Sequence, residues 1–158
     1  MSSKVPMRRR AYEQLQEDLR RLKLEDRPRI VREIKLAREL GDLSENAEYH
    51  AAKERQGHVE GRIRGMEDRL ARAQVIDPSD EAPDRVRFGV TVVLEDLNAG
   101  EQITYTIVGE DEADVSKGLI SVHSPVGHAL IGKRVYDEVI VTVPAGTRGY
   151  EVREIRYD

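Results

Sequence analysis

The sequence contains no cysteine and no tryptophan, and its single phenylalanine is Phe88. The lack of cysteine excludes disulfides, thiolate metal ligands and cysteine nucleophiles. Aromatic residues make up only 4% of the 158 residues, whereas 35% are charged. This composition favours a thin helical element with much solvent-facing surface over one large core rich in aromatic side chains.

Long hydrophobic runs are also missing. No apolar stretch approaches the roughly 18 residues of a membrane span, and residues 1–6 have no apolar signal core behind them. We therefore expect a soluble cytoplasmic protein without a membrane partner. Charge is unevenly divided: residues 1–76 contain 18 Lys+Arg against 14 Asp+Glu (net +4), and residues 77–158 contain 8 against 16 (net −8). This split argues against a uniformly basic nucleic-acid-binding protein.

Two stretches of the N-terminal half repeat apolar residues at spacings of three, four and seven, which is the heptad signature of a coiled coil. Because neither stripe can be buried alone and the connection is short, the pattern predicts an antiparallel helical hairpin. A helix from residue 12 to 40 would be roughly 40–45 Å long. The first stripe is Tyr12, Leu15, Leu19, Leu22, Ile30, Ile34, Ala37 and Leu40, and the second is Ala52, Val59, Ile63, Met66, Leu70 and Ala73.

Two residues are expected to interrupt or end a helix of the predicted hairpin. Pro28 removes a backbone donor inside the first stripe, so we expect a kink or break near residues 26–27. Gly41 predicts the end of the first helix, and the second helix is expected to start within residues 42–46.

The C-terminal half has a different periodicity. Residues 77–84 are polar and contain two prolines, which predicts a linker. Period-two runs at 87–94, 102–108, 139–143 and 150–155 predict strands, with a hairpin turn at 98–101 and a short helix at 124–131. We therefore predict an α+β protein: an N-terminal coiled-coil hairpin (1–76), a linker (77–84) and a small C-terminal α+β domain (85–158).

The predicted turn contains the acidic pair Asp42 and Glu45, three residues apart at the end of the hairpin. Two carboxylates there could share a Mg²⁺ ion or orient an attacking water. The structural alternative is that Asp42 is the N-cap of the second helix and Glu45 its N3 acid, as in a capping box. A convex tip offers no pocket for a substrate, so any chemistry there needs a partner that supplies the cavity.

Other chemistry is weakly supported. Basic residues near the turn could meet phosphates, but ordinary salt bridges with nearby acids also explain them. His50, His58, His123 and His128 do not form a convincing metal site, and Ser124 lacks the partners of a catalytic triad. A peptidyl-prolyl isomerase would need an aromatic-lined pocket, which Phe88 and the few tyrosines of this half hardly provide.

Residues 41–54, GDLSENAEYHAAKE, resemble the hairpin tip of the bacterial GreA (Gre) family of transcript-cleavage factors. The resemblance continues in order at residues 60–63, 73–77, 88–92, 107–114, 120–125 and 130–133. It implies a coiled-coil hairpin followed by an FKBP-like C-terminal domain. It also implies a partner, RNA polymerase, whose secondary channel receives the hairpin, and a substrate, the 3′ end of backtracked RNA, with DNA contacted only through the elongation complex.

The resemblance also implies roles for individual residues. Asp42 would hold a Mg²⁺ shared with the polymerase, and Glu45 would orient or activate the attacking water. Arg38, Lys53 and Arg55 would lie near the extruded RNA, and the residues Ser124 and Pro125 match the polymerase-docking loop. The protein would thus be an accessory factor without a cofactor of its own. An alternative is a regulator on the same scaffold that inhibits transcription without promoting cleavage.

Overall fold

A computed structural model describes residues 4–43 and 45–158, and these residues pack as two compact units. Tyr12–Ala73 form the helical unit, while Lys4–Ala11 and Gln74–Asp158 form the second. The short segments 4–11 and 74–76, which the sequence analysis grouped with the hairpin, pack with the second unit. Within the described ranges, none of the helices combines the length and apolar content of a membrane span.

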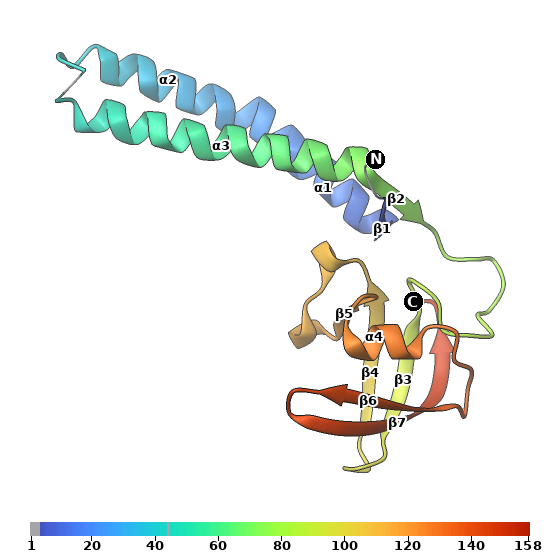
Figure 1. The fold of residues 1–158 in the computed structure, drawn as a ribbon. Helices are drawn as coiled ribbons and strands as arrows, with labels where there is room; N and C mark the ends of the chain where they lie inside the picture. The colour runs from blue at the N-terminus through green and yellow to red at the C-terminus, as the bar shows by residue number, and fades with distance from the viewer. Residues whose placement is uncertain (1–3, 44) are drawn as a thin grey trace. The chain divides into compact units, whose positions relative to one another are not determined.

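The helical unit is the predicted antiparallel hairpin (Figure 1). Its first arm contains α1 (Arg9–Arg21), a π-helical turn η1 (Leu22–Asp26) and α2 (Arg27–Arg38), and its second arm is α3 (Ala47–Arg72). The apolar stripes meet between the arms. Leu40 was predicted to belong to the first stripe, but it lies beyond the end of α2 and is 66% exposed. The buried members of the two stripes are Leu15, Leu22, Ile30, Ile34, Ala37, Ala52, Ile63 and Met66.

Pro28 does not break the first arm. The chain widens into the π turn just before it, where the N–H of Arg27 donates to the carbonyl of Leu22, five residues back. Pro28 then occupies the first turn of α2, where its missing N–H costs little. Of the expected kink or break near residues 26–27, the break is wrong, because the helix continues through a wide turn.

Side-chain pairs fix how the two arms of the hairpin align. The Arg27 guanidinium donates to both carboxylate oxygens of Glu60, at 2.9 Å each, and this bidentate contact holds the pKa of Glu60 below its ordinary value. Arg55 Nη2 pairs with Glu33 Oε2 at 2.9 Å farther along the arms. Because these pairs are partly exposed, they contribute little to the free energy of unfolding. Their main effect is to favour one alignment of the two arms.

The second unit begins with a two-stranded sheet formed by β1 (Val5–Arg8) and β2 (Ala73–Ile76), which the sequence analysis did not predict. Arg8 reaches Glu112, with Nη2 2.8 Å from Oε1, and both side chains are largely buried. A Cβ built on Gly109 would lie 2.4 Å from the carbonyl oxygen of Pro6. Only a glycine therefore lets β1 approach this part of the unit so closely.

The main sheet has five strands in the order β5-β4-β3-β7-β6. The β4–β5 pair is parallel and the others are antiparallel. The predicted β3–β4 hairpin and the helix α4 (Pro125–Leu130) are confirmed. Residues 87–90 were expected to be the start of the first strand, but β3 begins only at Thr91. Gly89, with φ of +87°, interrupts the extended chain there. The strands are β3 (Thr91–Asp96), β4 (Gln102–Val108), β5 (Leu119–Ser121), β6 (Glu138–Val143) and β7 (Gly146–Arg156), with 3₁₀ turns η2 (Glu110–Glu112) and η3 (Val115–Lys117) between β4 and β5.

The core of this unit is aliphatic, as the scarcity of aromatic residues requires. Leu130 of α4 is fully buried among the inward-facing side chains of the sheet, which include Leu94 of β3 and Ile107 of β4. One helix thus covers one face of a mixed sheet. This is the α+β class that the sequence predicted.

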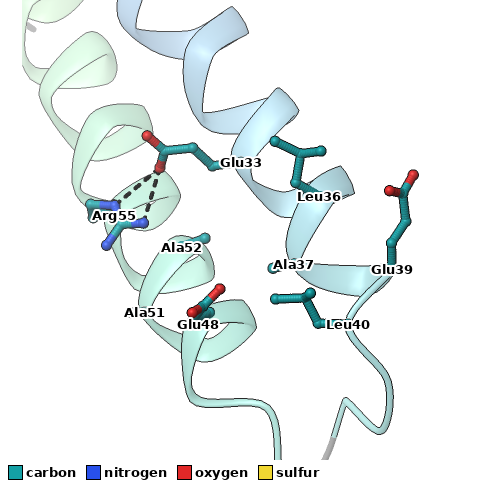
Figure 2. Close-up of a pocket in the computed structure, with 9 residues that line it drawn as sticks. All are labelled: Glu33, Leu36, Ala37, Glu39, Leu40, Glu48, Ala51, Ala52 and Arg55. Carbon is teal, nitrogen blue, oxygen red and sulfur yellow. Dashed lines mark hydrogen bonds and ion pairs between the residues drawn. The ribbon is translucent and has the colours of Figure 1, made fainter.

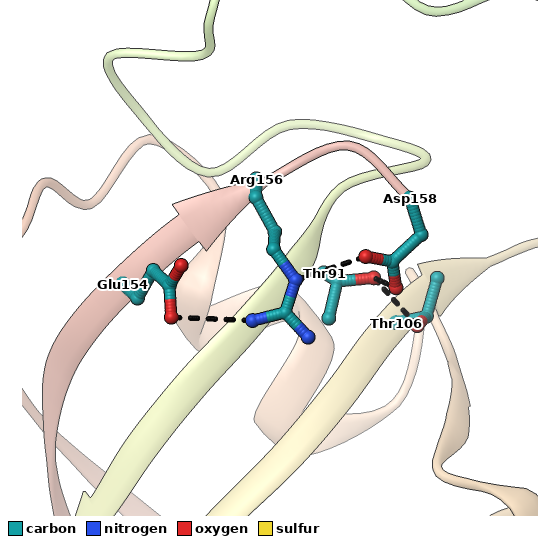
Figure 3. A network of polar contacts seen from close by, with 5 residues as sticks. All are labelled: Thr91, Thr106, Glu154, Arg156 and Asp158. Atoms are coloured by element: carbon teal, nitrogen blue, oxygen red, sulfur yellow. Dashed lines mark hydrogen bonds and ion pairs between the residues drawn. The ribbon is translucent and has the colours of Figure 1, made fainter.

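A polar network at the end of β7 joins the carboxylate of Asp158 to the buried hydroxyl of Thr91 (Figure 3). The buried Thr91 hydroxyl donates to Asp158 Oδ2 at 2.7 Å, and it lies 2.9 Å from the Thr106 hydroxyl. Thr91 Oγ1 has one hydrogen, so Thr106 is the donor in the second contact. The Thr91 hydroxyl, followed by Arg156 Nε at 2.9 Å, lowers the pKa of Asp158 below its ordinary value.

We therefore expect Thr91→Val to reduce the free energy of unfolding by about 1 kcal/mol at neutral pH. A depressed pKa stabilises the folded state fully above the unfolded pKa of about 3.9, and this contribution is lost as pH falls through the folded pKa. The difference between Thr91→Val and wild type should therefore shrink below about pH 4, as measured by urea unfolding. Thr106→Val is the control, since the hydrogen bond it removes involves two neutral hydroxyls. An equal pH dependence in both variants would contradict the assignment to Asp158.

Candidate functional site

The first arm of the hairpin ends in a tight reversal. α2 stops at Arg38, and the N–H groups of Glu39 and Leu40 donate to the carbonyls of Leu36 at 3.2 Å and Ala37 at 3.1 Å. Gly41 then takes φ of +129°, a conformation that side chains with a Cβ rarely adopt. The predicted role of Gly41 in ending the first arm is thus confirmed, although the helix proper ends three residues earlier.

The second arm starts at Ala47, with Asn46 as its N-cap. The Asn46 side chain accepts a hydrogen bond from the Tyr49 N–H at 3.0 Å. The capping-box alternative for Asp42 and Glu45 is therefore wrong. Asn46 stands directly before the continuous helical run and is as good a cap as Asp, so the helix begins four residues later than an Asp42 cap requires.

Asp42 and Glu45 are exposed and lie between α2 and α3, in the turn that joins the two arms (Figure 1). Ser44, the residue before Glu45, lies outside the described residues. The described part of the chain contains no cluster of three or more acidic or histidine side chains suited to a metal ion. Two exposed carboxylates match the one or two that Mg²⁺ usually takes from a protein, with the other ligands supplied by waters or by another molecule.

A groove on one flank of the tip is basic. Lys35, Arg38 and Lys53 line it, and its volume is about 340 Å³. The Arg38 guanidinium carbon lies 5.9 Å from the centre of the Tyr49 ring, a cation–π distance. Lys53 Nζ donates to Gln56 Oε1 at 3.1 Å. The described side chains that line this groove are basic, apolar or amide, and no carboxylate is among them.

Arg55 lies in a different groove, of about 470 Å³. Figure 2 shows it reaching from α3 to Glu33 on α2, while the exposed side chains of Leu36 and Leu40 line the opposite side of the groove. Glu39 and Glu48 also line this groove, so it is mixed in charge and partly apolar. The structure thus brings Arg38 and Lys53 together but separates Arg55 from them.

Family comparisons cover both units. The family description "Transcription elongation factor, N-terminal" matches residues 5–75, and "Transcription elongation factor, GreA/GreB, C-term" matches residues 80–157. The chain belongs to the GreA/GreB family of transcription elongation factors.

Relatives of this GreA/GreB chain match along its whole length. Transcription elongation factor GreA of Trichlorobacter lovleyi is 55% identical over 158 residues, covering 100% of both chains. GreA of Halorhodospira halophila is 54% identical over 157 residues, covering 99% of both. Among solved structures, GreA/GreB from Nitrosomonas europaea is 25% identical, with a TM-score of 0.44 and coverage of 98% of this chain and 100% of that one.

The predicted docking residues of this GreA/GreB chain lie at the start of α4. Ser124 is the N-cap: its Oγ accepts from the Gly127 N–H at 3.1 Å and donates to the Ser121 carbonyl at 2.7 Å. Pro125 occupies the first helical turn, where proline is favoured. The hydroxyl of Ser124 therefore holds the loop in shape, and it is not placed as a nucleophile.

Asn46 is the residue of the tip that sequence reasoning overlooked. Its side-chain Nδ2 also donates to the Ala37 carbonyl, at 2.6 Å. The signal was available, because Asn is among the strongest N-cap residues and precedes an uninterrupted helical stretch. It was missed because Asp42 offered a competing cap.

Proposed function

We propose that this elongation factor inserts its hairpin through the secondary channel of RNA polymerase and stimulates the polymerase to cleave the 3′ end of backtracked RNA. The observation that carries the proposal is the placement of Asp42 and Glu45, exposed on the turn at the hairpin end while Asn46 caps the helix. Because Asn46 is the helix cap, the carboxylates of these two acids are available to enter the active site of another molecule.

The tip supports an accessory role more than a self-contained enzyme. A convex turn cannot enclose a substrate or exclude water, and both are needed to strengthen electrostatic catalysis. Two exposed carboxylates also bind Mg²⁺ weakly, since the ion gives up its waters reluctantly. The polymerase would supply the cavity, the remaining metal ligands and the RNA.

Each acid then has a distinct task. Asp42 would hold the Mg²⁺ by a carboxylate oxygen, and Glu45 would orient the attacking water and accept its proton. A Mg²⁺ in such a site polarises the phosphate and lowers the pKa of a bound water. We place this activity in the cytoplasm with the transcribing polymerase, and contact with DNA would occur only through the elongation complex.

For the extruded RNA we propose Arg38 and Lys53, rather than Arg55, as phosphate ligands. They share the basic groove, whereas Arg55 is paired with Glu33 in the other. Arg38→Ala with Lys53→Ala should raise the factor concentration for half-maximal cleavage. The slope of the logarithm of this concentration against the logarithm of the salt concentration should also become smaller by about 1.4. Each single-strand phosphate that a cation neutralises contributes about 0.7 to this slope, and the double variant removes two cations. A titration of factor at several salt concentrations measures both quantities.

Arg55→Ala is the matched control for the single variant Lys53→Ala, because each removes one positive charge from α3. It should leave the salt dependence unchanged. A slope change for Arg55→Ala as large as that for Lys53→Ala would show that the two grooves are not distinguished by RNA.

The proposed function is tested by adding the protein to a stalled, backtracked elongation complex with labelled RNA. Release of short 3′ fragments, faster than with polymerase alone, is expected, together with renewed elongation. Inhibition of transcription without fragment release would instead favour the alternative of a channel-blocking regulator.

A further inference from the structure

The side-chain amide of Asn46 joins the two arms of the hairpin. Its Oδ1 accepts from the Tyr49 N–H of α3 at 3.0 Å, and its Nδ2 donates to the Ala37 carbonyl of α2 at 2.6 Å. The network fixes the orientation of the amide, since the opposite orientation would place oxygen against a carbonyl and NH₂ against an N–H. One half-buried side chain thus bonds the Tyr49 N–H in the first turn of α3 and gives the Ala37 carbonyl, which already accepts from the Leu40 N–H, a second donor near the end of α2.

The main chain of Asn46 extends the same connection into the turn. Its N–H donates to the Leu43 carbonyl at 3.4 Å, and its carbonyl accepts from the His50 N–H at 3.1 Å. Leu43 directly follows Asp42, and Glu45 directly precedes Asn46. Asp42 is therefore covalently joined to a residue that Asn46 hydrogen-bonds, and Glu45 is covalently joined to Asn46 itself.

The partners of Asn46 are themselves anchored. Ala37 is buried between the arms. Tyr49 packs against the apolar cluster of Ile30, Ile34 and Ala52. The side chain of Asn46 therefore fastens the turn to the packed part of the hairpin on both sides, and it does not simply cap a helix.

We propose that Asn46 is a positioning residue, which fixes the separation and direction of Asp42 and Glu45 for their joint action in the polymerase site. This inference deepens the proposed function and rests on it. A turn of this length has many accessible conformations, and ordering it before insertion avoids that entropic cost at the moment of reaction. A side chain that bonds both arms achieves this without itself being one of the two acids.

The test separates capping from positioning with two substitutions. Asn46→Ser keeps a good N-cap acceptor for the Tyr49 N–H but loses the amide that donates to the Ala37 carbonyl. Asn46→Asp keeps the acceptor as well, but it places a second carboxylate oxygen against the Ala37 carbonyl. For both, the maximal cleavage rate at saturating factor should fall roughly tenfold to a hundredfold, with a higher half-saturating Mg²⁺ concentration. The factor concentration for half-maximal cleavage and the urea midpoint of Asn46→Ser should stay close to wild type.

Several outcomes would overturn the proposal. Full cleavage with Asn46→Ser at limiting Mg²⁺ would mean that the residue only caps α3. Weaker polymerase binding at an unchanged maximal rate would assign it to docking. Asp42→Asn, measured in parallel, distinguishes failure of the proposed function from failure of the positioning role. If Asp42→Asn also cleaves normally, the proposed function itself is wrong. If Asp42→Asn is inactive while Asn46→Ser is fully active, only the positioning role of Asn46 is rejected.

Discussion

Asp42→Asn is expected to reduce the factor-stimulated rate of RNA cleavage by about 10² to 10⁴-fold, the usual contribution of a well-placed acid or base. The amide is nearly the same size as the carboxylate, but it lacks the charge that a divalent ion requires. Asp42 lies exposed on the turn and the N-cap of α3 is Asn46, so the substitution leaves that cap in place. Quenched-flow measurement of fragment release from a backtracked complex, at saturating factor, gives the rate.

Glu45→Gln should produce a similar loss, with a stronger effect on the pH dependence of cleavage because Glu45 is assigned to the water. The matched control is Glu48→Gln, which removes an acid from the first turn of α3, where it lines the other groove. Glu48→Gln should cleave at close to the wild-type rate. If the three variants behave alike, the tip acts through its general negative charge and the two specific roles are wrong.

The second large effect is expected in the docking loop. A Cβ built on Gly127 would lie 2.2 Å from the Ser121 carbonyl oxygen and 3.0 Å from Ser124 Oγ. Gly127→Ala must therefore displace the start of α4, and such overpacking costs about 1–3 kcal/mol. Since the family resemblance predicts that Ser124 and Pro125 dock on the polymerase, polymerase affinity should fall together with the stability of the C-terminal unit. Competition binding and thermal unfolding measure the two effects.

Gly65→Ala is the control for this prediction. Gly65 is exposed within α3, and a Cβ there would meet nothing within 4 Å. An alanine in an open helical position should stabilise the protein by about 0.5–1 kcal/mol, with unchanged affinity. Normal affinity of Gly127→Ala despite a lower melting temperature would exclude the α4 loop from docking.

The fold was predictable where its determinants are local. The heptad stripes located both arms, because burial between two helices needs only a periodic apolar face. The sheet of β1 and β2 was missed because each strand has four residues and its partner lies far along the chain. The Arg9–Asp77 pair that accompanies it, with Nε 2.8 Å from Oδ1, joins residues 68 apart. Such pairings become visible only when the chain is folded.

The candidate site was predictable in its acids but not in its arrangement. Asp42 and Glu45 were singled out correctly as turn residues, whereas the cap was assigned to the wrong side chain. The separation of Lys53 from Arg55 follows from helical geometry alone, since residues two apart point to different faces. What the sequence did not contain is the bridge from Asn46 to Ala37, since that hydrogen bond depends on how the arms align.

The π turn at Leu22–Asp26 has a consequence for the phase of the first stripe. A strict heptad that passes through Leu15 and Leu22 would next place an apolar residue at position 29, yet the buried residue is Ile30. The stripe is therefore one residue out of step, and a π turn accommodates one surplus residue without leaving the helix. Deletion of a single residue within 23–26 would restore an uninterrupted heptad on an ordinary α-helix. The surplus residue is thus absorbed by the π turn, so that the apolar face of α2 still points toward α3.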